Sequence, residues 1–356
     1  MAPIAAGVIT GIVVAFVDVR AHLDWVAAHF RGTFDRIADA NIAYFSVIMM
    51  TALFLTIAIH EAGHAVVGWL VGFRIHSIRI WRLQLEFPLR LSIFRGPMGG
   101  AGGWAICTPE RTDGLAVRAG LMLFAGPAVN LLTALLLYTM VPAEGLFLVV
   151  FMVWSFAIGA VNLLPVRTGP LFSDGHRILT LLFDRARGER WLALIALSKD
   201  LLDGAPPESM PEDIIKVATA IKDDSSDTVS AHVLAYMKAF RNKQCDEAAV
   251  ALETCLRCSS RTSKPLQHAL MADAAVFHGR CRKNAVLAEA WLNDMPVKLA
   301  IPWHRQWAEA AVLHARDRRE ELIAKLDAIE RAIREHAGPY QKVSLAAVHH
   351  WRSDLE

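Results

Sequence analysis

Residues 42–73 read IAYFSVIMMTALFLTIAIHEAGHAVVGWLVGF, an almost wholly apolar run interrupted by the HEAGH motif at residues 60–64. An apolar run of this length predicts a membrane-spanning helix. Two imidazoles and a carboxylate are costly at that depth unless a partner satisfies them. On a helix, His60 and His64 lie one turn apart on one face, so both can bind a single zinc ion. Glu61 lies beside them, where a carboxylate can accept a proton from the attacking water.

The HEAGH motif also has a less demanding interpretation. HExxH occurs by chance, and in a bundle of helices the two histidines can simply hydrogen-bond to neighbouring groups. The cost of burying this set in an apolar helix favours the metal site. The sequence therefore favours a metalloenzyme that works within a membrane.

Length and composition restrict the class of protein. The chain has 356 residues, 54% of them hydrophobic, and a formal net charge of +2. This length suits two domains. The absence of a long basic block excludes a typical nucleic-acid-binding protein. Long apolar runs fill the first half, whereas the second half has the pattern of a soluble helical protein.

Four membrane segments are predicted from length and polarity, at residues 3–19, 42–71, 115–141 and 145–164. The first is short, and the sequence leaves open whether it spans the membrane. An amphipathic stretch at residues 20–41 is expected to lie on the membrane surface.

A polar span with strand character separates the second and third membrane segments. Residues 83–93 alternate between apolar and polar side chains, which is the period of a β-strand, and Pro88 favours an edge position. A glycine-rich turn at 96–103 and a returning strand at 104–107 complete a predicted small β-hairpin. It is either an ordinary surface hairpin or a free strand edge that pairs with an unwound substrate.

Charge predicts the orientation in the membrane. Six arginines lie between residues 74 and 111, and five more lie between 167 and 190. The positive-inside rule places both regions, the N-terminus and the C-terminal domain in the cytoplasm. We therefore expect a multi-pass cell-membrane protein whose HEAGH motif lies nearer the cytoplasmic face.

The C-terminal part has the spacing of helical hairpins. Similar pairs at Ala239-Phe240, Val276-Phe277 and Val312-Leu313 are 37 and then 36 residues apart, close to the tetratricopeptide period. Such an array often binds a peptide or a protein partner, but a plain helical domain is an equal alternative.

These features predict an all-α multi-pass membrane protein with a small β-hairpin insert, followed by a soluble α-helical repeat-like domain. The change of composition after the linker Gly204–Pro207 sets the last boundary. The expected parts are an N-terminal membrane segment with a surface helix (1–41), a membrane-embedded metalloprotease core (42–204) and a cytoplasmic helical-hairpin domain (205–356).

The five cysteines show no disulfide-framework spacing, which favours a reducing compartment. They are Cys107, Cys245, Cys255, Cys258 and Cys281. The CxxC pair at 255 and 258 falls in a helical pattern, so we expect packed thiols and no zinc or redox site.

A catalytic zinc site needs a third protein ligand and an open position for water. Asp174 is the favoured candidate, because it follows the fourth membrane segment on the same side as the HEAGH motif. Asn162 and Pro165 would break the helix before it, where non-helical backbone can line a cavity. Asp174 could instead cap a helix, and His176 is a rival ligand.

Together, HEAGH at 60–64, FAGPAVN at 124–130, NLLP at 162–165 and Asp174-Gly175 resemble the site-2 protease family of intramembrane zinc metalloproteases. The resemblance covers residues 42–180. Two departures are evident. The interval between Asn162 and Asp174 is longer than in the commoner family pattern, and the span between His64 and Gly126 is too short for the PDZ domain that some relatives carry.

The resemblance implies a three-helix catalytic core in which His60, His64 and Asp174 hold Zn²⁺ and Glu61 is the general base. It also places Gly126 and Asn130 beside the site, as substrate-binding or site-supporting residues together with Asn162 and Pro165. The implied substrate is a single-span membrane protein, cleaved in or next to its membrane helix.

A second hypothesis is an inactive membrane scaffold or receptor that acts through its helical tail. The intact Glu61 and the complete ligand set favour the enzyme, because a scaffold does not need them. A prenyl-protein protease would need a further glutamate in a later membrane segment, and none is found there.

Overall fold

The structure is a computed structural model, and it describes most of the chain after residue 40. The described residues are 41–94, 102–140, 145–168, 171–297, 299, 301, 303–335 and 341–355. They divide into two compact units. Unit 1 holds the described residues up to Thr56 together with Asn130–Ile158, and unit 2 holds Ile57–Val129 and the chain from Gly159 onward.

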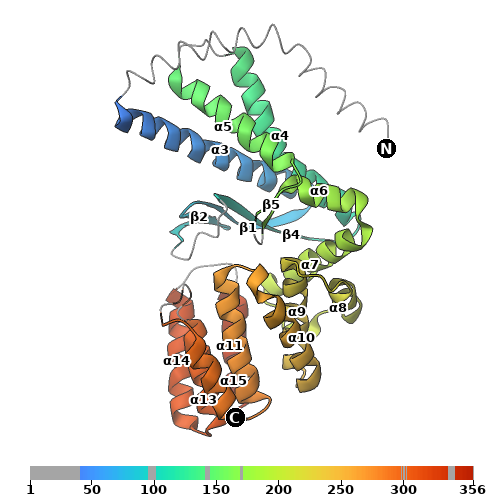
Figure 1. Ribbon diagram of the computed structural model, residues 1–356, viewed down its shortest axis with the longest axis vertical. Coiled ribbons are helices and arrows are strands. Elements are labelled where there is room, and N and C mark those ends of the chain that lie inside the picture. The colour runs from blue at the N-terminus through green and yellow to red at the C-terminus, as the bar shows by residue number, and fades with distance from the viewer. Residues whose placement is uncertain are drawn as a thin grey trace. The chain divides into compact units, whose positions relative to one another are not determined.

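Among the described residues, three helices are long and apolar enough to cross a membrane: α3 (Ile42–Leu70), α4 (Leu115–Met140) and α5 (Leu146–Leu163) (Figure 1). Their bounds match three of the predicted membrane segments to within one or two residues. The remaining predicted segment at 3–19 and the predicted surface helix at 20–41 lie almost entirely outside the described residues. Many large apolar side chains on the three helices are exposed, as expected for helices that face lipid.

Unit 1 is held together by close packing between α3 and α5. Ile48 and Ala52 of α3 are buried with Val150 of α5. Beside them, the hydroxyls of Thr56 and Ser155 are fully buried and lie 3.5 Å apart. Small hydroxyl residues at such an interface let two helices approach closely without leaving a polar group unpaired.

Unit 2 contains a four-stranded antiparallel sheet, where the sequence had predicted only a hairpin. Its strands are β1 (Phe73–Ile80), β2 (Leu83–Glu86), β3 (Arg90–Ile93) and β4 (Gly103–Pro109), in the order β3-β2-β1-β4 (Figure 1). The prediction that residues 83–93 form one edge strand is wrong. Pro88 lies in the turn between β2 and β3, so the missing amide hydrogen costs no ladder bond.

Strand β1 was not predicted from the sequence, because the alternation of apolar and polar residues is interrupted within it. The register against β4 shifts between Ile75 and Ser77, which indicates a β-bulge. A bulge inserts one extra residue and moves the following side chains to the opposite face. The apolar positions at 73 and 75 are therefore out of phase with those at 78 and 80, and no simple period of two remains.

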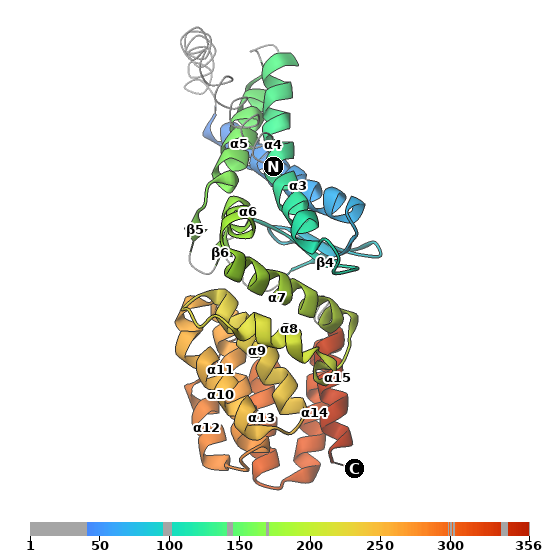
Figure 2. The same ribbon diagram turned by 90° about the vertical axis from the view of Figure 1, so that its right-hand side faces the viewer.

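After α5 the chain forms the short β5–β6 ladder (Arg167–Thr168 and Leu171–Phe172), then α6 (Asp174–Phe183) and α7 (Arg185–Asp203). Helix α7 contacts β4 on one side and the helices that follow it, α8 (Glu212–Thr219) and α9 (Ser226–Arg241), on the other (Figure 2). Its leucines share a buried core with α8 and α9, so α7 belongs structurally with the array.

The C-terminal array consists of consecutive helical hairpins, as the repeat spacing predicted (Figure 2). Gly279 shows how tightly successive hairpins pack, because a Cβ atom there would collide with the carbonyl of Ala311. Its helices are α9 (Ser226–Arg241), α10 (Cys245–Cys258), α11 (Lys264–Arg280), α12 (Ala285–Asp294), α13 (Trp303–Ala315), α14 (Arg319–Glu335) and α15 (Gln341–Ser353).

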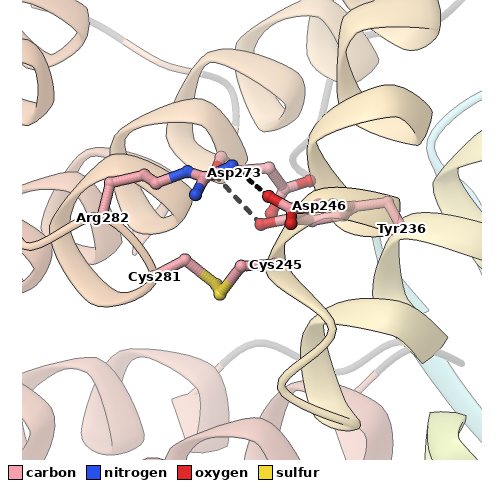
Figure 3. Close-up of a disulfide and its surroundings, with 6 residues drawn as sticks. All are labelled: Tyr236, Cys245, Asp246, Asp273, Cys281 and Arg282. Atoms are coloured by element: carbon pink, nitrogen blue, oxygen red, sulfur yellow. Dashed lines mark hydrogen bonds and ion pairs between the residues drawn. A yellow bond between two sulfur atoms is a disulfide. The ribbon is translucent and has the colours of Figure 1, made fainter.

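A disulfide joins Cys245 at the start of α10 to Cys281 just after α11 (Figure 3). The ion pair between Asp246 and Arg282 lies beside it. The cysteines show no disulfide-framework spacing, which favoured a reducing compartment. Disulfides are most common in oxidising compartments, so this pair counts against that expectation. The CxxC thiols are unpaired and buried, as predicted.

We expect reduction of the disulfide to destabilise the array. The bond closes a segment with a sequence separation of 36 residues. By the loop-entropy relation this constraint is worth about 3–4 kcal/mol, if the native structure is unstrained. The purified full-length protein should therefore unfold at a lower temperature in the presence of a phosphine reductant. A Cys245→Ser, Cys281→Ser double variant should show no response to the reductant, and a wild-type melting curve unchanged by it would contradict the expectation.

Candidate metal centre

Helices α3 and α6 bring three ligand atoms together within unit 2. The Nε2 atoms of His60 and His64, one turn apart on α3, lie 3.1 Å from each other. The carboxylate Oδ2 atom of Asp174, the first residue of α6, lies 3.2 Å from the first and 3.4 Å from the second. All three side chains are largely shielded from solvent. Residues 114 positions apart along the chain thus form one cluster of metal-ligating groups.

The spacing of these atoms fits a zinc ion. Zinc binds imidazole nitrogen and carboxylate oxygen at about 2.0–2.2 Å with tetrahedral geometry. Tetrahedral ligand atoms at that radius lie about 3.4 Å apart, and the three observed separations are close to this value. Two imidazoles and one carboxylate also leave a fourth position open, which is the arrangement of catalytic zinc sites.

The protonation of His64 points to a cation in the same place. Its Nδ1 atom lies 2.8 Å from the carbonyl oxygen of Met122, which can only accept a hydrogen bond. The Nδ1 atom must therefore carry the proton, and in the neutral ring Nε2 presents a lone pair. That lone pair faces the Asp174 carboxylate, another acceptor. A metal ion between the two satisfies both, as does a proton on Nε2, and the Met122 carbonyl fixes the ring as such outer partners commonly do.

Asp174 is held in its ionised form. Burial opposes the charge, but the neighbouring His60 and His64 imidazoles outweigh burial and lower the pKa of this carboxyl below its ordinary value. An ionised carboxylate is the form that binds a metal.

The start of α6 is fixed against the end of α5. The Oγ atom of Ser173 caps α6 by accepting from the amide of His176, and it donates to the carbonyl of Leu164. Gly175 packs against the carbonyl of Leu163 so closely that a Cβ atom there would collide with it. The sequence also allowed Asp174 to cap this helix, and in the structure Ser173 is the cap of α6.

Glu61 is buried beside the three ligands and faces strand β4. The backbone of Ala105 hydrogen-bonds to its carboxylate, and Arg79 of β1 interacts with it electrostatically. A Cβ atom on Gly103 would collide with the Glu61 carboxylate. The glycine therefore lets the strand approach the proposed general base, and the strand in turn holds the carboxylate in one position.

Two further glycines bring α3 and α4 into contact at the site. A Cβ atom on Gly126 would collide with the His64 ring, and one on Gly63 would lie 2.8 Å from the carbonyl oxygen of Ala125. Gly126, which the family resemblance placed beside the site, therefore lies directly against a candidate metal ligand.

The other predicted site residues do not belong to the cluster of three ligands. Asn130 is fully buried in α4 but belongs to unit 1. Asn162 is half-buried in the last turn of α5, and Pro165 follows in the exposed connection. His176 lies outside the ligand cluster, with its ring stacked on Phe172 at 4.6 Å between centroids. Its pKa is lowered by burial and by the nearby charge of Arg177.

Three contacts at the site were missed from the sequence. The approach of Gly103 to Glu61 could have been suspected from the glycine-rich run, which was interpreted as a turn only. The backbone groups of Ala105 and Met122 leave no signal in the sequence, because any residue carries an amide hydrogen and a carbonyl.

Comparisons with known proteins give no further identification. The chain matches no protein-family model, no curated protein and no solved structure. Any assignment of function therefore depends on the motifs of the chain and on the geometry of the site.

Proposed function

We propose that this protein is an intramembrane zinc metalloprotease, which hydrolyses a peptide bond in or next to the membrane-spanning helix of a substrate protein. The observation that carries the proposal is the convergence of His60, His64 and Asp174, with the Glu61 carboxylate buried beside them. The site-2 protease resemblance supports the same reaction. Three helices able to cross a membrane are compatible with a substrate of this kind.

The residues of the site have distinct roles in this proposal. His60, His64 and Asp174 would hold zinc, which when bound supplies electrostatic polarisation of the scissile carbonyl and of water. Glu61 accepts a proton from the attacking water and later delivers it to the leaving amine. The amide of Ala105 and the Met122 carbonyl keep Glu61 and His64 in the orientation that these roles need.

Strand β4 is the proposed binding edge for substrate. It is the end strand of the sheet, paired on one side with β1, and it lies beside Glu61 through Gly103 and Ala105. A helical substrate hides its peptide bonds and must unwind before hydrolysis. An unwound segment could then add to this edge by main-chain hydrogen bonds, which would direct it toward the general base.

The proposed location is the cell membrane, with several spans and a cytoplasmic C-terminal array. The excess of arginines on both sides of the α4–α5 pair supports this orientation, whereas the Cys245–Cys281 disulfide in the array does not. The array would recruit a partner protein or a substrate.

Zinc content tests the proposal. We expect about one zinc per chain in the purified protein, and its loss from Asp174→Ala, because removing one of three ligands leaves too few to hold the ion. Elemental analysis measures the stoichiometry. Asp113→Ala, which changes an exposed carboxylate elsewhere in unit 2, should retain the zinc. A wild-type protein without stoichiometric metal would contradict the proposal and favour a membrane scaffold that acts through its C-terminal array.

A further inference from the structure

We propose that the ion pair between Arg177 and Asp227 is a positioning contact, through which the C-terminal array holds Asp174 in register with His60 and His64. The proposal rests on the proposed function, because it concerns the same metal centre. It gives the array a direct part in the chemistry: the first helix of the array determines where the third metal ligand lies.

The ion pair connects the ligand-bearing helix to the array. Arg177 lies on α6, and its Nη1 and Nη2 atoms donate to the two carboxylate oxygens of Asp227 at 2.5 and 2.8 Å. Asp227 lies in the first turn of α9, where the helix dipole favours a negative charge. Two parallel hydrogen bonds of this kind fix the orientation as well as the distance of the partners.

Solvent screening of this pair is small, because both side chains are buried. The side chain of Arg177 is 15% exposed and that of Asp227 is 9% exposed. The guanidinium also lies over the rings of Phe172 and Trp191, at 4.2 and 5.4 Å from their centroids. Arg190 of α7, which is almost fully buried, lies 3.7 Å from Asp227 on another side. Arg177 is thus confined by rings and by a carboxylate that is itself fixed.

Arg177 and Asp174 lie on the same short helix, so the ion pair of Arg177 also constrains the position of the Asp174 carboxylate. Arg177 follows Asp174 by three residues, which places the two side chains about 60° apart around a helix of 3.6 residues per turn. Helix α6 is short, with ten residues. Its start is set by Ser173 and Gly175 against α5, its length packs against α7, and Arg177 links it to α9. Without the ion pair to α9, we expect the carboxylate to shift relative to the two imidazoles.

Metal affinity and a spectroscopic signal test the proposal in the full-length protein. The variants are Arg177→Gln, Asp227→Asn and their combination. We expect each single variant to bind zinc about ten-fold more weakly in chelator competition, a typical effect for residues that orient a ligand. The double variant should lose no more than Asp227→Asn alone, because both changes remove the Arg177–Asp227 contact and only Asp227→Asn also removes the carboxylate that faces Arg190. With cobalt in place of zinc, the visible ligand-field bands should change in all three. Arg177→Lys should recover part of the affinity, since lysine keeps the positive charge but cannot form the two parallel hydrogen bonds of the guanidinium.

A second buried ion pair provides the matched control. Arg280 and Asp354 pair within the array with side chains 13% and 22% exposed, and neither lies on α6 or α9. Arg280→Gln should destabilise the array but leave zinc affinity and the cobalt spectrum unchanged. The positioning role would be overturned if folded Arg177→Gln had the zinc affinity and the cobalt bands of the wild type. A wild-type protein that binds no zinc would instead overturn the proposed function, so the two failures are distinguishable.

Discussion

Glu61→Gln is expected to retain zinc and to lose peptide hydrolysis almost completely. The amide has nearly the same size as the carboxylate, so the contacts with Gly103 and Ala105 can persist. It cannot accept a proton at neutral pH, however, and general-base catalysis contributes about 10²–10⁴-fold to the rate. The loss should therefore fall in that range. The measurement is cleavage of a single-span model substrate by the purified protein, together with its zinc content.

A matched substitution separates this effect from a general loss of charge. Glu110 is exposed and follows β4 directly, so Glu110→Gln should cleave at the wild-type rate. Cleavage by Glu61→Gln at a rate close to the wild type would exclude Glu61 as the general base. The metal site could still stand, because zinc content is measured in the same samples.

Gly126→Ala should disable the site without removing any polar group. The added methyl group would collide with the His64 ring, which must then rotate away from the other ligands or push α4 from α3. Either movement removes one ligand from its place, so we expect zinc affinity to fall by about ten- to one hundred-fold and activity to fall with it. Competition with a chelator measures the affinity.

The control for this substitution lies on the same helix. Gly120 has no heavy atom within 4 Å of an added Cβ atom. Gly120→Ala should therefore leave zinc affinity unchanged, and the higher helix propensity of alanine should stabilise α4 by up to about 1 kcal/mol. Equal zinc affinities for Gly126→Ala and Gly120→Ala would contradict the close approach of α4 to His64.

The elements that the sequence predicted well are those with strong local patterns. Three apolar runs gave α3, α4 and α5, because few other structures accommodate so many consecutive apolar residues. His60 and His64 were identified by their spacing on one helix. Asp174 was chosen because the topology returns it to the same side as α3, and the structure brings it within 3.4 Å of both imidazoles.

What could not be predicted depends on contacts between distant residues. Strand β1 was hidden by its bulge, and the disulfide joins cysteines whose spacing in the sequence is not distinctive. The pairing of Arg177 with Asp227 joins two charged residues among many, and nothing local distinguishes them from exposed ones. Such contacts follow from how helices pack, which a periodic pattern does not specify.

The length of α3 has a consequence for the membrane crossing that we propose for it. Its 29 residues span about 44 Å at 1.5 Å per residue, whereas the hydrocarbon layer of a bilayer is about 30 Å thick. Such hydrophobic mismatch is relieved by tilting, at fractions of a kcal/mol per ångström. A change in acyl-chain length would alter the tilt and so the depth of His60, which lies about 15 Å before the end of the helix. Bilayer thickness would then set how readily water enters the proposed catalytic centre.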